Sequence, residues 1–353
     1  MRTANIVYWY GKSEMPKDGG GLRALAWQEA LTALGFETTI HALRPTGMGV
    51  QAQTPLRKLK KKLIPMPLRG ALPPMTPADL NVVTVPSVFD SAIRVLPRAS
   101  LIFDWMDLWS VNARTMGSAS IMSRPGGICQ GLFWEVRQRR LVNSPRANVF
   151  AGFGDTRLTD SADASPGHWI PTPITPASSG AQSEGKSART VGFIGNFDYP
   201  PNVMSLRKFF KDYAGEFIQK GIAIKVAGFG SEIVKDWGFP VEVLGRVDSL
   251  SDFYGQIDAA IVPIDHGGGI KAKAVEAMAY GVPVLGTAHV ANGFSPEWSS
   301  FIGRIEDLLR QPSQLPPVPS VEEFDIQFSQ RAFTESVRSM LTTTGHLTAQ
   351  SAL

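Results

Sequence analysis

Residues 257–287, IDAAIVPIDHGGGIKAKAVEAMAYGVPVLGT, limit most strongly what this chain can fold into. Residues 257–264 form a short apolar run, which is typical of a buried parallel strand. A glycine turn at 267–269 follows it. A helix is predicted over residues 270–280, with Gly281 as its stop signal, and another short apolar strand comes next. The stretch therefore predicts a β-α-β unit of a parallel α/β sheet.

The glycine turn and the start of the helix form a candidate anion site. Because Gly268 and Gly269 lack a Cβ, their backbone N–H groups and that of Ile270 can approach an anion at the positive end of the helix. Lys271 and Lys273 add positive charge at the same place. A phosphate group fits this combination.

The predicted helix has one polar face. Lys273, Glu276 and Tyr280 share it by their spacing, whereas Val275 and Met278 point towards the sheet. This face offers a cation for phosphate and a carboxylate for sugar hydroxyls. Residue by residue, the same pattern also fits a flexible turn and a solvated ion pair in an ordinary α/β protein.

Taken together, the stretch resembles the donor-binding signature of GT-B glycosyltransferases, especially family four (group 1). In that family a proline-ended strand, a glycine turn, a lysine and an E-A-M-A-x-G-x-P-V run occur in this order. The resemblance implies two Rossmann-like α/β domains facing each other across a cleft. It also implies a nucleotide-diphosphate sugar as donor, bound by the residues above. The family usually has a second acid where this chain has Gly268, and the nearest acid is Asp265, so retention or inversion stays open.

A second signature is TVGFIGNFDYPPN, which resembles the F-x-G-N-x-x-Y-P-P-N start of the family's donor domain. The resemblance implies that Asn196 and Tyr199 line the cleft, and that backbone groups near Gly228 and Val247 contact the base. Asn202 is expected to cap a helix that begins near residue 203. A purely structural turn is the alternative.

The amino-terminal part also begins with a strand, a glycine-rich loop and a helix, expected over residues 5–10, 11–21 and 22–34. Gly20 lies in that loop, where backbone amides can face a ligand. A plain turn is the alternative. In GT-B enzymes the equivalent loop lies beside the donor phosphates and the acceptor.

Two carboxylates follow the strand expected over residues 100–103. Asp104 and Asp107 belong to the segment SLIFDWMDLWS, which resembles the Y-D-x-x-D-L-W-S run of some family-four relatives. One of them is a candidate to accept a proton from the acceptor hydroxyl, and Asp107 is favoured. The alternative is that both cap the following helix.

Composition narrows the class of protein. The 353 residues are 43% hydrophobic and 19% charged, as in a soluble globular protein. Apolar runs are too short to span a bilayer, and no signal peptide is recognisable, so a cytoplasmic protein is expected. The single Cys129 permits no internal disulfide. No metal-ligand cluster is evident, so neither a metal nor a bound cofactor is expected beside the nucleotide-sugar co-substrate.

Charge is unevenly distributed. Residues 1–173 hold 20 Lys and Arg against 12 Asp and Glu, whereas the remainder holds 15 against 19. Residues 56–70, LRKLKKKLIPMPLRG, form a basic amphipathic segment that suits an anionic membrane, with a solvated loop as the alternative. Nucleic acid is a less supported partner, because the excess is modest and no reader motif is present.

Three regions are expected from these signals. They are an acceptor domain over residues 1–173, a donor domain over residues 174–330, and a carboxyl-terminal region over residues 331–353. A small-residue linker over residues 177–189 separates the two domains. An amphipathic helix over residues 324–341 crosses back onto the first domain by family resemblance.

The resulting hypothesis is a cytoplasmic glycosyltransferase of polysaccharide biosynthesis. It would move a sugar from a UDP- or GDP-linked donor to a glycan, lipid-linked or other cell-envelope hydroxyl, with a peripheral position on the inner face of the plasma membrane. One alternative keeps the fold but makes the chain a nucleotide-sugar epimerase. The other is a non-catalytic GT-B scaffold that binds a membrane or nucleic acid through residues 56–70.

Overall fold

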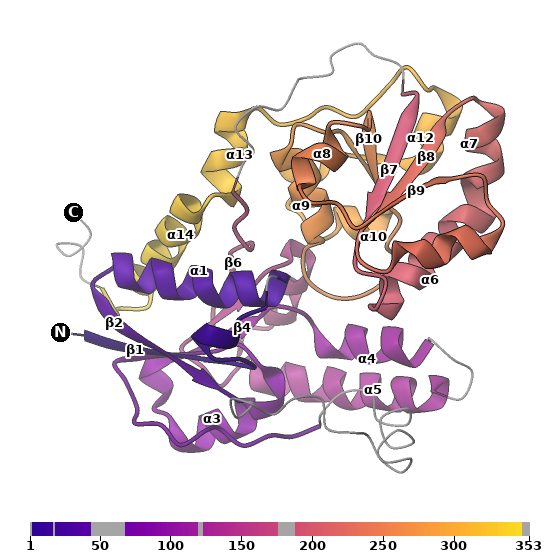
Figure 1. Ribbon diagram of the computed structural model, residues 1–353. Coiled ribbons are helices and arrows are strands. Elements are labelled where there is room, and N and C mark those ends of the chain that lie inside the picture. The colour runs from indigo at the N-terminus through magenta and orange to yellow at the C-terminus, as the bar shows by residue number, and fades with distance from the viewer. Residues whose placement is uncertain (1, 17, 44–67, 119–122, 176–187, 348–353) are drawn as a thin grey trace. The chain divides into compact units, whose positions relative to one another are not determined.

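The computed structural model describes residues 2–16, 18–43, 68–118, 123–175 and 188–347. The chain divides into two compact units (Figure 1). Unit 1 consists of Met1–Pro173, Gly267–Ile270 and Gln327–Leu353, and unit 2 consists of Ile174–His266 and Lys271–Ile326.

Unit 1 is built on a parallel six-stranded sheet with the order β2-β1-β3-β4-β5-β6. Its order changes direction between β1 and β3, which creates a topological switch point at the carboxyl ends of these strands. Helices cover both faces, so the central strands β3, β4 and β5 are wholly buried, whereas the edge strands β2 and β6 are partly exposed. The strands are β1 (Arg2–Tyr8), β2 (Phe36–Ala42), β3 (Leu80–Val83), β4 (Leu101–Trp105), β5 (Ala147–Phe150) and β6 (Gly167–Trp169).

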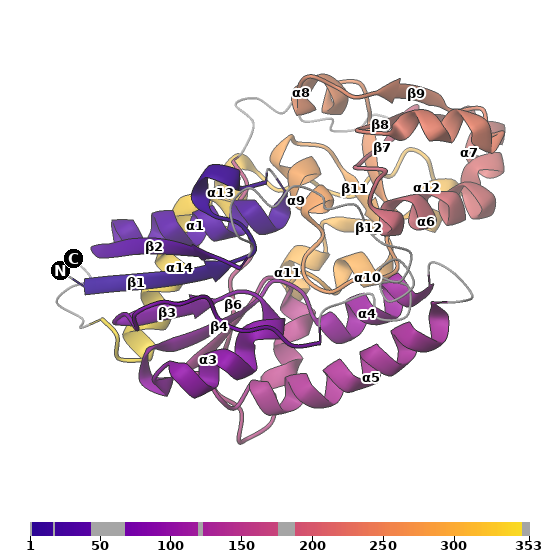
Figure 2. The same cartoon turned by 60° about the horizontal axis from the view of Figure 1, so that its bottom comes forward.

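The helices of unit 1 include the carboxyl-terminal helix α14, which lies beside α1 in Figures 1 and 2. Phe333 of α14 meets Trp27 of α1 edge to face, with 5.4 Å between the ring centroids. Val337 and Leu341 complete the same core cluster. The helices are α1 (Gly19–Ala33), α3 (Phe89–Val95), α4 (Trp109–Ser118), α5 (Arg124–Leu141) and α14 (Gln330–Thr343).

Unit 2 has a second parallel sheet, with the order β12-β11-β10-β7-β8-β9. The chain runs outward from β7 to β9, returns to β10 beside β7, and continues to β12. This is the Rossmann order, and its switch point lies at the carboxyl ends of β7 and β10. The strands are β7 (Thr190–Ile194), β8 (Ala223–Ala227), β9 (Glu242–Gly245), β10 (Ala259–Val262), β11 (Val284–Gly286) and β12 (Ile302–Arg304).

A phenylalanine-rich cluster fills one side of the unit 2 sheet. Phe193, Phe209 and Phe217 are among its fully buried members, and Leu308 joins it from α12. The helices are α6 (Pro200–Phe209), α7 (Gly215–Gln219), α8 (Leu250–Tyr254), α9 (Ala272–Ala279), α10 (Ala288–Ala291), α11 (Pro296–Ser299) and α12 (Ile305–Arg310). Two fully parallel sheets with covering helices confirm the predicted α/β class.

The expected final helix over residues 324–341 is wrong in one respect. The region holds two helices, α13 (Val321–Phe328) and α14, separated at Ser329. Ser329 is extended, with φ −76° and ψ 163°, and its hydroxyl accepts a hydrogen bond from the Ala332 N–H at 3.0 Å. This side-chain cap starts a new helix.

Candidate active site

The switch point of unit 2 brings together two of the predicted signatures. The turn with Asn196 follows β7, and the segment that leads to α9 follows β10. Because β7 and β10 are neighbours in the sheet, their carboxyl ends lie at the same edge. Open α/β sheets bind ligands at this position.

The turn after β8 packs against the turn after β7 so tightly that residue 228 must be glycine. A Cβ on Gly228 would lie 1.9 Å from the backbone oxygen of Gly195, and Gly228 has φ +117°. The Gly228 N–H donates to the Gly245 carbonyl at 2.8 Å. The absence of side chains here leaves backbone groups at the edge of the sheet, where the base was predicted to bind.

Lys273 reaches this turn from α9. A Cβ on Gly195 would lie 3.1 Å from both Lys273 Cε and Asn202 Nδ2, so the three residues share one small space. Asn202 does not cap α6 as expected, because α6 begins at Pro200 and the cap position is Tyr199. Instead Asn202 Nδ2 donates to the Asn196 carbonyl at 2.8 Å and holds the turn closed.

Helix α9 has the two faces predicted from its spacing. Val275 and Met278 are buried, whereas Lys273, Glu276 and Tyr280 are only partly covered. The helix starts at Ala272, two residues later than expected. Lys271 occupies the cap position with extended backbone.

The Lys273 ammonium has no hydrogen-bond or ion-pair partner among the described residues. Its Nζ lies over the ring of Phe193, 5.8 Å from the ring centroid. Burial lowers the pKa of Lys273, the charge of Glu276 opposes this shift, and that of Lys271 adds to it. A desolvated cation on a strand-end turn is suited to receive an anion.

Glu276 stands one helical turn after Lys273, on the same face. Burial raises the pKa of its carboxyl group, and the charge of Lys273 opposes that shift. The carboxylate makes no hydrogen bond within the described part of the chain. Carboxylates in such a position accept hydrogen bonds from hydroxyl groups.

A tyrosine pair lies against Glu276, and one of its members was missed by the sequence reasoning. The rings of Tyr254 and Tyr280 stack with 4.7 Å between centroids and 22° between planes. Tyr254 is 3% exposed, and its hydroxyl is buried without a hydrogen-bond partner in the described structure. Burial first, then the charge of Glu276, raises the pKa of this phenol. No local motif distinguishes Tyr254 from an ordinary core tyrosine.

Three other predicted donor-site residues lie in exposed or partly buried positions. Asn196 is exposed, and its side-chain oxygen accepts from the Asp198 N–H at 2.9 Å, which shapes the turn. Tyr199 is 50% exposed at the start of α6. Val247 is partly buried just after β9. Their contacts with a donor stay predictions.

Asp265, the acid nearest the position of the family's second acid, is already paired. Its carboxylate lies 3.2 Å from Lys208 Nζ of α6, which also reaches Asp212 at 3.2 Å. These hydrogen bonds raise the pKa of Lys208, the one to Asp265 most. Asp265 is thus occupied in an ion pair that sequence spacing gave no reason to expect.

Gly20 of unit 1 lies inside a helix, which corrects the expected loop. Helix α1 begins at Gly19, and the carboxylate of Asp18 caps it by accepting from the Gly21 N–H at 2.9 Å. A Cβ on Gly20 would lie 2.5 Å from the hydroxyl of Tyr8. The helix starts early because Asp18 is a strong cap that outweighs the poor helix propensity of three glycines.

Asp104 is part of a strand and does not follow one, which corrects its predicted position. It is the fourth residue of β4 and is 0% exposed. Arg23 Nε and Nη2 donate to both of its oxygens at 2.8–3.0 Å, and Trp27 Nε1 donates at 2.7 Å. Because these partners occupy the carboxylate, we assign Asp104 a structural role.

Asp107 is half-buried between β4 and α4, and it is the carboxylate of this pair that remains a catalytic candidate. Its Oδ1 would lie 2.6 Å from a Cβ on Gly269, so it stands beside the glycine turn, which belongs to unit 1. Gly269 has φ +69°, and its missing side chain permits this approach.

The amides of the glycine turn are engaged by side chains of unit 1. The Gly268 N–H donates to Asn112 Oδ1 at 3.1 Å, and the Gly269 N–H donates to Asp155 Oδ2 at 2.7 Å. These are the amides that the sequence assigned to phosphate. Asn112 and Asp155 lie far away in the sequence and belong to no motif, so sequence reasoning missed both.

The basic segment 56–70 lies mostly outside the described residues, which resume at residue 68. Within the described ranges, no group of three or more His, Cys, Asp or Glu side chains is arranged to hold a metal ion. In the same part of the chain, no helix is both long and apolar enough to span a membrane.

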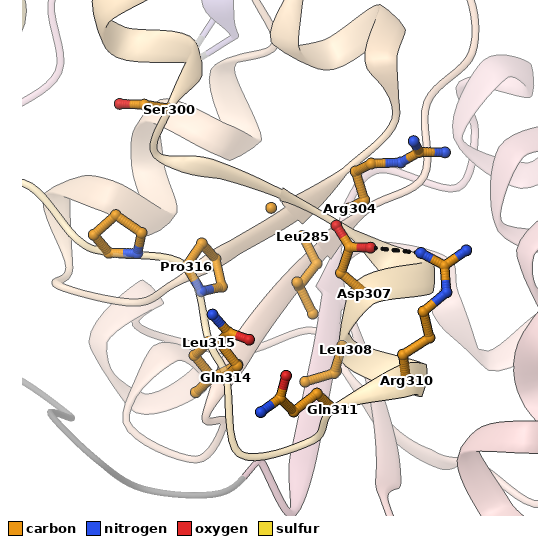
Figure 3. A pocket seen from close by; sticks show the side chains of 12 residues that line it. Leu285, Ser300, Arg304, Asp307, Leu308, Arg310, Gln311, Gln314, Leu315 and Pro316 are labelled. Carbon is orange, nitrogen blue, oxygen red and sulfur yellow. Dashed lines mark hydrogen bonds and ion pairs between the residues drawn. The ribbon is translucent and has the colours of Figure 1, made fainter.

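A hollow of about 380 Å³ lies elsewhere in unit 2, between β12, α12 and the proline-rich segment that follows (Figure 3). Asp307 and Arg310 on its rim pair with each other at 3.0 Å. Leu285 and Leu308 form its apolar floor. None of the predicted site residues lines it.

Comparisons with known proteins agree with this architecture. Residues 188–298 match the model of the family described as Glycosyl transferases group 1. No curated protein sequence matches the chain. The solved structure of sucrose-phosphate synthase from Thermosynechococcus elongatus is similar to it, with a TM-score of 0.66 at 13% identity, covering 98% of this chain and 100% of that one.

Two further solved structures resemble the chain over nearly its full length. HepE from Anabaena, in complex with UDP and glucose, has a TM-score of 0.52 at 12% identity and covers 97% of this chain and 100% of its own. A glycosyltransferase from Rickettsia africae ESF-5 has a TM-score of 0.53 at 10% identity, with 97% and 98% covered. At such identities the likeness concerns the fold.

Proposed function

We propose that this chain, a GT-B glycosyltransferase whose residues 188–298 match the group 1 family, transfers a sugar from a nucleotide-diphosphate sugar to a hydroxyl group. The predicted fold is confirmed by the similar solved structures, and the match of residues 188–298 to the group 1 family bears out the predicted family and enzyme class. The donor, the acceptor and the roles of single residues are the subject of the proposal.

The observation that carries the proposal is a pair of side chains on α9 that have no hydrogen-bond partner among the described residues. Lys273 and Glu276 are desolvated, share one face and stand at the switch point of a Rossmann sheet. Keeping such groups without partners destabilises the ligand-free fold. A nucleotide diphosphate offers what both lack, because its phosphate accepts from the ammonium and its ribose hydroxyls donate to the carboxylate.

The glycine turn and Lys271 complete the proposed phosphate site. The amides of Gly268 and Gly269 would exchange their present acceptors, Asn112 and Asp155, for phosphate oxygens, and the Ile270 amide would join them. Lys271 and Lys273 would neutralise the charge that grows on the leaving group as the sugar departs. In this proposal neither a metal nor a further cofactor takes part in the transfer.

Asp107 is the proposed acceptor-side carboxylate. It follows β4 at the carboxyl edge of the unit 1 sheet and is partly accessible, unlike Asp104. A carboxylate there can accept the proton of the attacking hydroxyl, or hold that hydroxyl in line with the sugar. The deprotonated oxygen then attacks the anomeric carbon as the nucleotide diphosphate leaves.

The acceptor is proposed to be a glycan, a lipid-linked sugar or another cell-envelope hydroxyl, met at the inner face of the plasma membrane. Two sequence observations support this: the positive excess of residues 1–173 and the basic segment 56–70. Both favour an anionic partner.

Thermal unfolding with a panel of nucleotides tests the donor site. UDP, GDP, ADP, TDP and CMP are compared on the wild type, on Lys273→Ala, and on Lys220→Ala as a matched lysine exposed elsewhere in unit 2. UDP is the first to try, because HepE was solved with UDP and glucose. We expect one nucleotide to raise the Tm of the wild type and of Lys220→Ala but not that of Lys273→Ala. An equal rise in all three proteins would remove Lys273 from the donor site, and no rise with any nucleotide would count against the proposal.

A further inference from the structure

Helix α5 of unit 1 carries an exposed apolar row that the fold does not explain. Ile128, Leu132 and Val136 are spaced four residues apart and are 48%, 54% and 55% exposed. Phe133, beside them, is 37% exposed. Four-residue spacing places such side chains along one side of a helix. The row therefore lies along one exposed side of α5, the helix labelled in Figure 2.

The opposite side of α5 already makes the packing that holds the helix in place. Trp134 is fully buried, and Leu141 is 3% exposed. Gly127 meets Gly117 of α4 so closely that a Cβ on it would lie 2.4 Å from the Gly117 Cα. This inner face supplies the core contacts of the helix, whereas the side chains of the outer apolar row stay about half exposed.

Arginines stand at both ends of the row. Arg124 opens α5, and Arg139 and Arg140 close it, all three exposed. The acid of the helix, Glu135, pairs with Arg139 and with Arg114 of α4. The helix thus presents aliphatic side chains with exposed arginines at both ends, a combination that suits an apolar surface edged by anionic headgroups.

We propose that the outer face of α5 binds an anionic lipid surface and lies along it. An 18-residue helix is about 27 Å long, which lets both arginine groups reach headgroups while the row between them enters the acyl boundary. A lipid surface fits better than a protein partner, because specific protein interfaces use about 20–30 residues on each side. The inference adds a described element to the proposed membrane partner and does not depend on sugar transfer.

Co-flotation with vesicles tests the proposal on the full-length protein. Vesicles of phosphatidylcholine alone are compared with vesicles that also contain phosphatidylglycerol. We expect binding to the anionic vesicles only, weakened by salt, and reduced about tenfold or more by Leu132→Glu or by Val136→Glu. Val95→Glu is the matched control, because Val95 is 56% exposed on α3 of the same unit. It should bind as the wild type does.

The single cysteine of the chain gives an independent readout. Cys129 is exposed and follows Ile128 on α5. A polarity-sensitive fluorophore on its sulfur should shift to the blue with anionic vesicles and stay unchanged with neutral ones. An unchanged spectrum with bound protein would show that another surface makes the contact, and this would overturn the proposal.

Further variants separate the possible failures. Replacing the lysines at 58, 60, 61 and 62 by glutamine tests the basic segment. Binding lost there but kept in Leu132→Glu would assign the membrane contact to that segment alone and refute the role of α5. Self-association that Leu132→Glu abolishes, without vesicle binding by the wild type, would make the row an interface between copies and also overturn the proposal. The nucleotide-induced Tm shift should be intact in Leu132→Glu, so these outcomes do not bear on the donor site.

Discussion

Replacing Asp104 by asparagine distinguishes a structural carboxylate from a catalytic one. In the structure Asp104 is 0% exposed and Arg23 is 1% exposed, and they meet at 2.8 Å. Asp104→Asn removes the negative charge but leaves the guanidinium buried and charged. Breaking one side of a buried ion pair costs about 3–5 kcal/mol. Trp27 Nε1 also loses a charged acceptor.

This cost should be visible in thermal unfolding. For a folded unit of this size, each kcal/mol lowers the Tm by about 2–4 °C, so a drop of roughly 6–20 °C is expected. At a temperature where the variant remains folded, its transfer rate and its nucleotide-induced Tm shift should be close to those of the wild type. The isosteric Asp107→Asn is the control. It should keep most of its Tm and lose transfer by roughly 100-fold or more if Asp107 acts as the base.

The reverse result would refute this reasoning. If Asp104→Asn unfolds at the wild-type temperature but has lost transfer, Asp104 acts on the substrate and the ion pair is incidental. A further variant adds a check that does not depend on activity. Arg23→Met combined with Asp104→Leu removes both charges, and it should recover much of the stability lost in the single variant, because buried pairs can be replaced by apolar contacts.

Three other predictions concern unit 2. Burial raises the pKa of Glu276 in the fold, so the stability linked to its protonation is present in acid and is lost as pH rises through that raised pKa. Glu276→Gln should therefore unfold at a higher temperature than the wild type at neutral pH, with the difference fading in acid, in thermal scans across pH. Burial lowers the pKa of Lys273, so its ammonium should lose its proton at a lower pH than that of an ordinary lysine. Nucleotide affinity measured by calorimetry should therefore fall as the pH rises through that lowered pKa. Lys273→Arg should abolish this fall, because arginine stays charged. Tyr254→Phe removes a buried hydroxyl that has no hydrogen-bond partner among the described residues, so the ligand-free Tm should stay the same or rise. Tyr213→Phe should lower the Tm, because the Tyr213 hydroxyl donates to Glu306 at 2.7 Å.

The β-α-β unit around α9 was predicted well from the sequence because its signals are local. The strand that ends at Val262, the helix that begins at Ala272 and the strand at Val284 all lie within one short stretch. The 3.6-residue period then separated Val275 and Met278 from Lys273 correctly. Periodicity suffices where one side of an element faces a core and the other faces solvent.

The residues at which helices begin were harder to predict, because single side chains determine them. Asp18 starts α1 three residues before the expected helix, and Ser329 divides the last helix in two. Both residues act as caps through one hydrogen bond each. Such a hydrogen bond determines where a helix begins as strongly as the apolar periodicity does. The sequence alone does not show which of several polar residues makes it.

The chemistry of unit 1 was the least predictable part, and the reason lies in the distance between partners along the chain. Asp104 and Asp107 look alike in sequence, each an acid at the end of an apolar run. What separates them is Arg23, 81 residues away from Asp104, which occupies one carboxylate and not the other. In the same way, the amide of Gly269 is engaged by Asp155, 114 residues away. A motif shows which groups can react, but only the fold shows which of these groups already have hydrogen-bond or ion-pair partners. For this reason Lys273 and Glu276, which have no hydrogen-bond partner among the described residues, support the proposed donor site more strongly than the motif that first drew attention to them.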